Sequence, residues 1–517
     1  MLIELNEYNK KGISLKKIIS EHFNIRNIDK LPLEEYFNLY LKNDNNLYAQ
    51  WLVKNFFSSL DKFKSSYLNH CFGKLEDLGS RKLVETVWFE IFNLNFAKSP
   101  NFFPERKKLL NILNENYHFP IDEENLNKNI EKIEGYPFKK QSMYLTNITL
   151  TERQFILETI KKEDISSIIS DLRELYPEIY YYLDWDLINP DNKIDRWIID
   201  YLKEYNISKI KNTKTNQLEE LINTKNMDMS SFLEWFYTIP TSEIEEDNHN
   251  IWIDGLGAEW FPLIVHLIEN NSKGKGKILK EKMITRVNLP SITKCNRYEF
   301  DKIEDLDYYI HKQKSYKYPN TLIEEIEIIK NIVKKIVDIP REKITILSDH
   351  GLSFLCQKEF GNIKKHTFEH AKHNGRYVWI DNENYKDDND YLIWKIDDGE
   401  CQDKKAIVAL RHTSLNNTPY KEVHGGATPE EILVPYISIE TKKEFIKGEK
   451  ISYEIEPKEF NILISQPLIQ FSISPSPSHI PQALFNERPL KLSFKNDNYS
   501  LDLNGFKVGK HLIIINW

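Results

Sequence analysis

Short apolar runs that stop at polar side chains mark the middle of the chain. The run 251–253 is followed by Asp254, and the run 344–347 is followed, after one serine, by Asp349 and His350. Runs of this length and composition are typical of buried strands. Ligands of open α/β sheets bind outside the carboxyl ends of the strands, so we expect these three side chains in a crevice.

Amphipathic segments separate these runs, with apolar positions at helical spacing over 260–268 and 321–337. Alternating strands and helices predict a doubly wound α/β sheet, which we assign to residues 246–440. Residues 1–245 have mainly helical patterning and are predicted to form one or two helical subdomains. Beyond residue 440 the apolar period changes to two, and residues 441–517 are predicted to form a small β-sandwich.

The polar residues at these strand ends have the chemistry of a metal site. Asp-His-Gly at a strand end also forms ordinary capped turns, but Asp254 supplies a carboxylate at a second strand end. A third apolar segment, 287–293, ends in Thr293 and is followed by three polar residues, Lys294, Asn296 and Arg297. This segment offers a hydroxyl nucleophile beside cations.

Two further imidazoles are placed to bind a second metal ion. Asp307 and His311 are four residues apart, which puts both side chains on one face of a helix, although the same spacing also makes ordinary surface contacts. His424 supplies one more ligand. Gly425 and Gly426 after it allow a close approach of backbone to a metal or phosphate, or form a plain turn.

The ordered set Asp254, Thr293, Asp307 with His311, Asp349 with His350, and His424 resembles the two-metal site of the alkaline phosphatase superfamily. The surrounding segments LPSITKCNR, ILSDHGLSFL, HNGRYVWI and VHGGATPEEILVPYI resemble the PglZ domain of bacterial phage-defence systems of the BREX type. The resemblance covers roughly residues 250 to 440. Its last segment is the most specific.

The resemblance implies an alkaline-phosphatase-like sheet with two metal positions. One position is surrounded by Asp254, Thr293, Asp349 and His350, and the other by Asp307, His311 and His424. Carboxylate and imidazole ligands suit zinc, with manganese or magnesium as alternatives. All seven side chains should then converge in one crevice.

The resemblance also implies a metal-dependent phosphohydrolase of a phage-defence system, with Thr293 as the nucleophile. A phosphodiester, either DNA or a nucleotide, is the preferred substrate, and other proteins of the defence system are the expected partners. Two alternatives stay open. The same site would serve a phosphomonoesterase or phosphomutase, and a non-catalytic scaffold of the defence complex would keep the metals for its fold.

Other cations and histidines are ambiguous. Arg376 and Arg411 join Lys294, Asn296 and Arg297 as candidate substrate-binding residues, although a structural ion pair explains Arg376 equally well. His366, His370 and His373 have helical spacing and are predicted to form a solvated face. The lysine-rich run 273–282 either steers a polyanion or is a solvated loop, and we favour the loop.

Length, charge and cysteines limit the remaining possibilities. The chain has 517 residues and a formal net charge of −8, which excludes nucleic-acid binding through bulk electrostatics. Its four cysteines, Cys71, Cys295, Cys356 and Cys401, lack close spacing and predict reduced thiols in a cytoplasmic protein. No apolar stretch approaches the ~20 residues of a membrane span, so no membrane association is expected.

Overall fold

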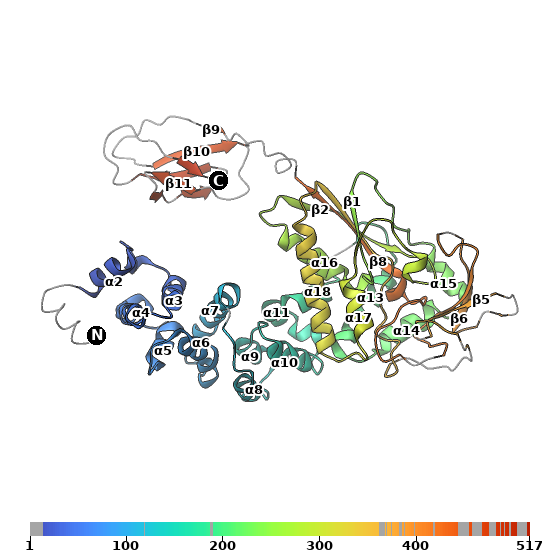
Figure 1. Ribbon diagram of the computed structural model, residues 1–517, viewed down its shortest axis with the longest axis horizontal. Coiled ribbons are helices and arrows are strands. Elements are labelled where there is room, and N and C mark those ends of the chain that lie inside the picture. Colours follow the sequence, from blue (N-terminus) through green and yellow to red (C-terminus); the bar gives the residue numbers. More distant parts are fainter. Residues whose placement is uncertain are drawn as a thin grey trace.

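The computed structural model describes residues 14–442 except 118, 187–189, 361–367, 369, 374, 382–384, 387, 398 and 417–418 (Figure 1). Further along the chain it describes 454–456, 468–474, 482–485, 488–490, 492–495, 498–503 and 514–516.

The first half of the described chain is helical, as predicted. Its α-helices are α2 (Leu15–Phe23), α3 (Leu33–Lys42), α4 (Leu47–Ser59), α5 (Tyr67–Lys74), α6 (Ser80–Phe89), α7 (Phe102–Asn116), α8 (Glu123–Glu131), α9 (Phe138–Tyr144), α10 (Leu150–Ile160), α11 (Ile165–Leu175), α12 (Pro177–Leu183), α13 (Arg196–Lys211), α14 (Asn216–Lys225) and α15 (Met229–Phe236). Helices α2 to α9 extend away from the sheet as an arm (Figure 1). No helix among the described residues is both long and apolar enough to cross a membrane.

The central sheet has five strands in the order β2-β8-β4-β1-β3. The strands are β1 (His249–Ile253), β2 (Lys277–Arg286), β3 (Asp301–Ile303), β4 (Lys343–Leu347) and β8 (Leu433–Thr441). Strand β1 is parallel to β3 and β4, whereas β8 is antiparallel to β4 and β2. The prediction of an α/β sheet is confirmed, and β8 makes this sheet mixed in direction.

Alternating side chains of β1 and β4 face two different clusters. Ile251, Ile253, Ile344 and Ile346 belong to the main core, together with apolar residues of α16 (Phe261–Asn271) and α18 (Asn320–Val337). Helices α16 and α18 pack against each other beside the sheet (Figure 1). Trp252 and Leu347 belong to a second cluster, which contains only strand and loop residues. Helices on both faces, as in a doubly wound sheet, therefore stay a prediction.

Smaller antiparallel sheets complete the described structure. Strands β5 (Tyr377–Ile380), β7 (Lys405–Ala409) and β6 (Tyr391–Lys395) form one of them, between β4 and β8 in the sequence. The C-terminal strands are β9 (Glu454–Glu456), β10 (Leu468–Ser474), β11 (Gln482–Phe485), β12 (Arg488–Leu490), β13 (Leu492–Lys495), β14 (Asn498–Asp502) and β15 (Ile514–Asn516). They pair as β13-β14-β10-β9 and β12-β11-β15. The face-to-face packing that a β-sandwich requires remains a prediction.

The last N-terminal helices pack directly into the α/β region. Lys209 of α13 is fully buried, and its Nζ lies 2.8 Å from Glu325 of α18 and 2.7 Å from Glu422. Asn226, which caps α14, donates to the carbonyl oxygens of Leu410 and Ala427 at 2.7 and 2.9 Å. The helical region is therefore continuous with the region that carries the candidate site.

The prediction of reduced thiols is wrong for two of the four cysteines. Cys295 and Cys401 form a disulfide, with Cα atoms 5.2 Å apart and a sequence separation of 106 residues. Cys71 and Cys356 are free and buried. The expected cytoplasmic location rested on reduced thiols, and this disulfide removes that support. Only the tertiary structure brings such distant cysteines together, so their spacing along the chain could not predict the disulfide.

Candidate metal centre

Adjacent parallel strands bring the first carboxylates together. Ile251 and Trp252 of β1 pair with Ile346 and Leu347 of β4, so the residues after both strands reach the same sheet edge. The backbone N–H of Gly255 donates to Oδ1 of Asp349 at 3.4 Å. Gly255 has φ +77°, and a Cβ there would lie 3.3 Å from that of Asp307, so glycine suits this turn.

Three of the predicted ligands are buried at this edge. Asp254 is 3% exposed, and Asp349 and His350 are fully buried. His350 Nε2 lies 3.3 Å from Asp254 Oδ1 and 3.5 Å from Asp349 Oδ2. Buried charged groups occur mainly where they are paired or bind a metal, so this cluster has the expected character of a metal site.

Thr293 lies beside these residues at the start of the short 3-10 helix Thr293–Cys295. Its Oγ1 is 3.4 Å from Asp254 Oδ1 and 3.3 Å from His350 Nε2. The side chain of Asn296 holds the turn, because its amide donates to three backbone carbonyl oxygens, those of Asn288, Pro290 and Ile292. The turn thus fixes the hydroxyl next to two candidate ligands.

The second predicted set adjoins the first. Asp307 and His311 lie on helix α17 (Asp305–Lys312), with Asp307 Oδ1 3.3 Å from His311 Nε2. His311 Nε2 is 3.4 Å from His424 Nε2. The imidazole rings of His424 and His350 stack with centroids 3.8 Å apart. All seven side chains named from the sequence therefore converge, and neither Asp307 nor His311 points away from the others.

Backbone carbonyl groups orient two of the imidazoles. His350 Nδ1 lies 3.2 Å from the Gly351 carbonyl oxygen, and His424 Nδ1 lies 3.1 Å from that of Ser291. A carbonyl oxygen only accepts, so Nδ1 carries the hydrogen in each ring. The Nε2 atom of His350 faces the carboxylates of Asp254 and Asp349, and that of His424 faces His311 Nε2. Histidines that bind metals are commonly fixed in this way.

The cluster strongly perturbs the pKa values of its members. Burial raises the pKa of Asp349 to about 7, against the opposing effect of His350. Burial lowers the pKa of His350, but Asp349 and Asp254 outweigh it and raise the pKa to about 9. Burial raises the pKa of Asp254, but His350 and Lys302 together hold it at about 2. Interacting groups of this kind are typical of functional sites.

The donor atoms fit divalent metal ions. Asp307 Oδ1 and Asp349 Oδ2 are buried and accept no hydrogen bond from the described residues. Three overlapping groups have ligand atoms within 4.8 Å of one another, namely Asp254, Asp349 and His350; Asp307, His350 and His424; and His311, His373 and His424. Buried oxygens without donors, together with imidazoles facing them, are what a cation would satisfy.

Two residues of this cluster were missed in the sequence. Lys302 of β3 places its Nζ 2.5 Å from Asp254 Oδ2. The strand pattern around it is only three residues long, so nothing singled it out. His373 was predicted on a solvated helix face, but its ring centroid lies 4.2 Å from that of His424. His366, the first residue of that predicted face, lies outside the described residues.

The predicted substrate-binding residues have different environments. Lys294 is exposed, and Arg297 is exposed with its Nε 4.0 Å from Glu299. Asn296 is engaged in its own turn, as described above. Arg411 donates to Asn223, Asn389 and Asp390. Of this set, Lys294 and Arg297 are the ones still open to a ligand.

Arg376 supports the backbone of the most specific segment. Its guanidinium is fully buried and donates to both carboxylate oxygens of Glu431, at 3.0 and 2.6 Å. A Cβ on Gly426 would lie 2.2 Å from this guanidinium, so the glycine makes room for Arg376. Glu431 also completes a capping box with Thr428. The geometry favours the structural ion pair that the sequence left open for Arg376.

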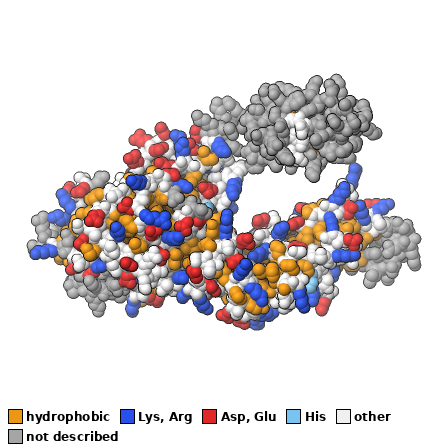
Figure 2. Space-filling view, turned by 180° about the vertical axis from the view of Figure 1, so that it is seen from behind, with side chains coloured by type: hydrophobic (Ala, Val, Ile, Leu, Met, Phe, Trp, Pro, Cys, Tyr) orange, Lys and Arg blue, Asp and Glu red, His pale blue; other side chains and the backbone are white. Residues whose placement is uncertain are grey.

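The lysine-rich run lies at the other end of the sheet. Lys277, at the start of β2, pairs with Thr441, whereas Arg286 at its end pairs with Leu433. The start of β2 is therefore near the start of β4, opposite the edge that carries Asp349. Acidic and basic side chains are also interspersed over the visible face of the described residues (Figure 2). The lysines of the run are exposed or half-buried, but the prediction of a loop is wrong for residues 277–282, which belong to strand β2.

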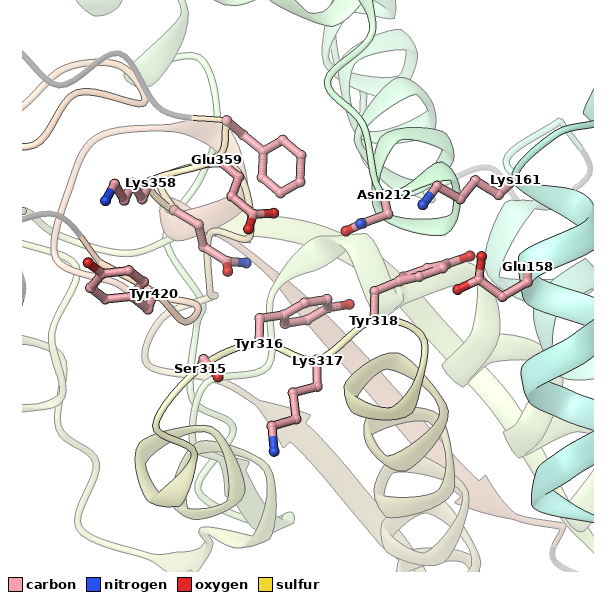
Figure 3. A pocket seen from close by; sticks show the side chains of 12 residues that line it. Glu158, Lys161, Asn212, Ser315, Tyr316, Lys317, Tyr318, Lys358, Glu359 and Tyr420 are labelled. Atoms are coloured by element: carbon pink, nitrogen blue, oxygen red, sulfur yellow. The ribbon is translucent and has the colours of Figure 1, made fainter.

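A separate cavity of about 460 Å³ lies between the N-terminal helices and the α/β region. Glu158 and Lys161 lie on one side of it, and Lys358 and Tyr420 on the other (Figure 3). None of the seven candidate ligands lines this cavity. The cavity and the candidate metal centre are therefore distinct features.

Comparison with known proteins identifies part of the chain. Residues 300–439 match the family model of the BREX system PglZ alkaline phosphatase-like domain. The match includes Asp307, His311, Asp349, His350 and His424, while Asp254 and Thr293 precede it. No curated protein matches the chain. The resemblance inferred from the sequence is confirmed: residues 300–439 are similar to the BREX system PglZ alkaline phosphatase-like domain.

Proposed function

We propose that this protein is a metal-dependent phosphohydrolase that cleaves phosphodiesters with Thr293 as the nucleophile. The observation that carries the proposal is the position of the Thr293 hydroxyl, 3.4 Å from Asp254 and 3.3 Å from His350, in a cluster of buried metal-type ligands. A hydroxyl in such a cluster is placed to attack a phosphorus atom bound there.

Two divalent cations, zinc with manganese or magnesium as alternatives, would be held here. Asp254, Asp349, His350 and Thr293 would bind one ion, and Asp307, His311 and His424 the other. Such ions supply Lewis-acid stabilisation of the charge on phosphoryl oxygens. Asp307 Oδ1 and Asp349 Oδ2 accept no hydrogen bond from the described residues and lie 3.3 and 3.5 Å from histidine nitrogens, which supports this assignment.

The residues of the chain would hold the nucleophile and manage its proton. Asp254 and His350 orient Thr293 Oγ1, and Asp254 Oδ1 is close enough to receive the hydroxyl proton. Attack would form the bond between Oγ1 and phosphorus and break the bond to the leaving alcohol. Hydrolysis of the phosphothreonine by water would then restore the hydroxyl and release the remaining phosphate ester.

The ion pairs of the nearby cationic side chains favour a phosphodiester over a phosphomonoester as the substrate. A phosphomonoester carries an additional negative charge, which enzymes usually neutralise with cationic side chains. Arg376 is committed to Glu431, Arg411 to Asp390, and Lys302 to Asp254. Lys294 and Arg297 remain, and both are exposed. We therefore rank phosphomonoesterase or phosphomutase activity at the same site second.

The proposal also includes the partners, the substrate and the cellular location of the protein. The matched domain is described as part of the BREX system, so other proteins of that system are the proposed partners. DNA or a nucleotide is the proposed substrate. A cytoplasmic location is proposed because such substrates are present in the cytoplasm. The net charge of −8 implies that any DNA contact is local.

The test compares two model substrates on the purified protein. Metal-stripped protein is loaded with zinc, manganese or magnesium and assayed with bis(4-nitrophenyl) phosphate and 4-nitrophenyl phosphate. The proposal predicts hydrolysis of both, with kcat/KM at least about tenfold higher for the diester. A reversed preference would select the monoesterase. Hydrolysis of neither, with any metal and with partner proteins added, would select the scaffold.

A further inference from the structure

We propose that His373 is a ligand of the metal ion held by Asp307, His311 and His424. This inference rests on the proposed function, and it makes the two metal positions chemically unequal. Neither the sequence pattern nor the family match assigned His373 to the site.

The position of the imidazole carries the inference. Ligand atoms of His373, His311 and His424 all lie within 4.8 Å of one another. The ring centroid of His373 is 4.2 Å from that of His424 and 6.3 Å from that of His311. Three imidazoles from three separate segments therefore surround one point. Such convergence is the usual arrangement of a histidine-rich metal site.

The backbone around His373 is fixed so that the ring faces the other histidines. The N–H of Lys372 donates to the Tyr377 carbonyl oxygen at 2.8 Å, and the N–H groups of Gly375 and Arg376 donate back to Lys372 at 3.0 Å. Arg376 is itself anchored by Glu431. This tight turn is part of the segment anchored by the buried ion pair.

Two local features show that this conformation is held in place. His373 has φ +45°, in the left-handed region that costs free energy for a residue other than glycine. Its ring also stacks on Tyr377, with centroids 5.5 Å apart and planes 29° apart. The His373 ring thus contacts both Tyr377 and His424.

The two donor sets then select different metals. Asp307, His311, His373 and His424 would provide three imidazoles and one carboxylate, a set that suits zinc. Asp254, Asp349, His350 and Thr293 would provide two carboxylates, a hydroxyl and one imidazole, a set in which oxygen donors predominate. Oxygen-rich sites accept manganese or magnesium more readily. We therefore expect zinc to bind more tightly at the His373 position.

The test measures metal binding and not only turnover. His373→Ala is compared with wild type and with His370→Ala, which removes an exposed histidine from the same part of the chain. Metal content after dialysis and zinc titration against a chelating indicator give stoichiometry and affinity. We expect His373→Ala to weaken one zinc position by more than the ~10–100-fold that loss of an outer partner costs. His370→Ala should match wild type.

A second measurement uses wild-type protein and needs no substitution. X-ray absorption at the zinc edge of wild-type protein loaded with one zinc equivalent counts the imidazoles around the metal. Three imidazoles are expected, and a count of two would overturn the proposal. The proposal would also be overturned if the folded His373→Ala variant bound zinc with wild-type affinity. If the zinc results hold while no phosphate ester is hydrolysed, the proposed function fails and the His373 assignment stands.

Discussion

His350 and His424 stack face to face, with ring centroids 3.8 Å apart and planes 3° apart. Each ring donates its Nδ1 hydrogen to a backbone carbonyl group, of Gly351 and of Ser291 respectively. The two residues belong to different proposed metal positions. Their stack therefore joins the positions physically, and the carbonyl groups leave both Nε2 atoms available as ligands.

The first prediction concerns this pair. His424→Ala should lower metal content by one equivalent, because Asp254, Asp349, His350 and Thr293 are untouched. Asp254→Asn should instead weaken the other position. Metal analysis of both variants after dialysis against a weak chelator provides the check. Equal retention of both metals in His424→Ala would show that His424 is not a ligand.

The second prediction concerns Glu259, which is buried with neither carboxylate oxygen hydrogen-bonded by the described residues. Burial raises its pKa to about 8, against the opposing effect of Lys209. The folded protein therefore keeps a proton that the unfolded chain loses above its pKa of 4.5. The unfolding free energy should fall between pH 4.5 and 8, by a few kcal/mol in total.

Glu259→Gln removes this titration and provides the comparison. The difference in unfolding free energy between wild type and Glu259→Gln, measured on metal-free protein by denaturant titration, should change in favour of the variant as the pH rises. Titrations elsewhere cancel in that difference. A difference that stays constant from pH 5 to pH 8 would mean that Glu259 is ionised in the folded protein.

The third prediction concerns Arg376. Its removal leaves the carboxylate of Glu431 buried without its partner, so Arg376→Ala should lower stability by about 3–5 kcal/mol. The exposed Arg297 is a matched control, and Arg297→Ala should change stability by less than about 0.5 kcal/mol. Thermal unfolding followed by circular dichroism measures both. If Arg376→Ala melts like wild type, the buried pair does not support the fold.

The fourth prediction concerns the cysteines. Thiol titration in denaturant should find two thiols per chain, those of Cys71 and Cys356, and four after reduction. Peptide mapping without reductant should recover the segments around Cys295 and Cys401 as one cross-linked species. Four thiols before reduction would contradict the disulfide.

The sequence was most informative where function follows from local pattern. Asp254 follows the apolar strand β1 directly, Asp349 and His350 follow β4 after one serine, and the parallel pairing of the two strands brings their ends together. Asp307 and His311 share a helix face through their spacing alone. These features depend on strand and helix periodicity, which can be recognised in a single sequence.

Other parts of the site depend on contacts between distant segments. His373 reaches His424 through a turn with positive φ, and Arg376 reaches Glu431 across the structure. Lys302 meets Asp254 only because β3 pairs with β1. The disulfide of Cys295 with Cys401 and the antiparallel direction of β8 have the same origin. Local pattern carries no information on such pairings, so the sequence did not predict them.

The most direct test of the account is turnover of bis(4-nitrophenyl) phosphate by wild type, Thr293→Ser and Thr293→Ala at matched metal content. Thr293→Ser keeps a hydroxyl and should retain activity. Thr293→Ala keeps all the other proposed ligands but loses the nucleophile, so kcat should fall roughly a thousandfold or more. Wild-type turnover by Thr293→Ala with its metals bound would contradict the central claim that Thr293 attacks phosphorus.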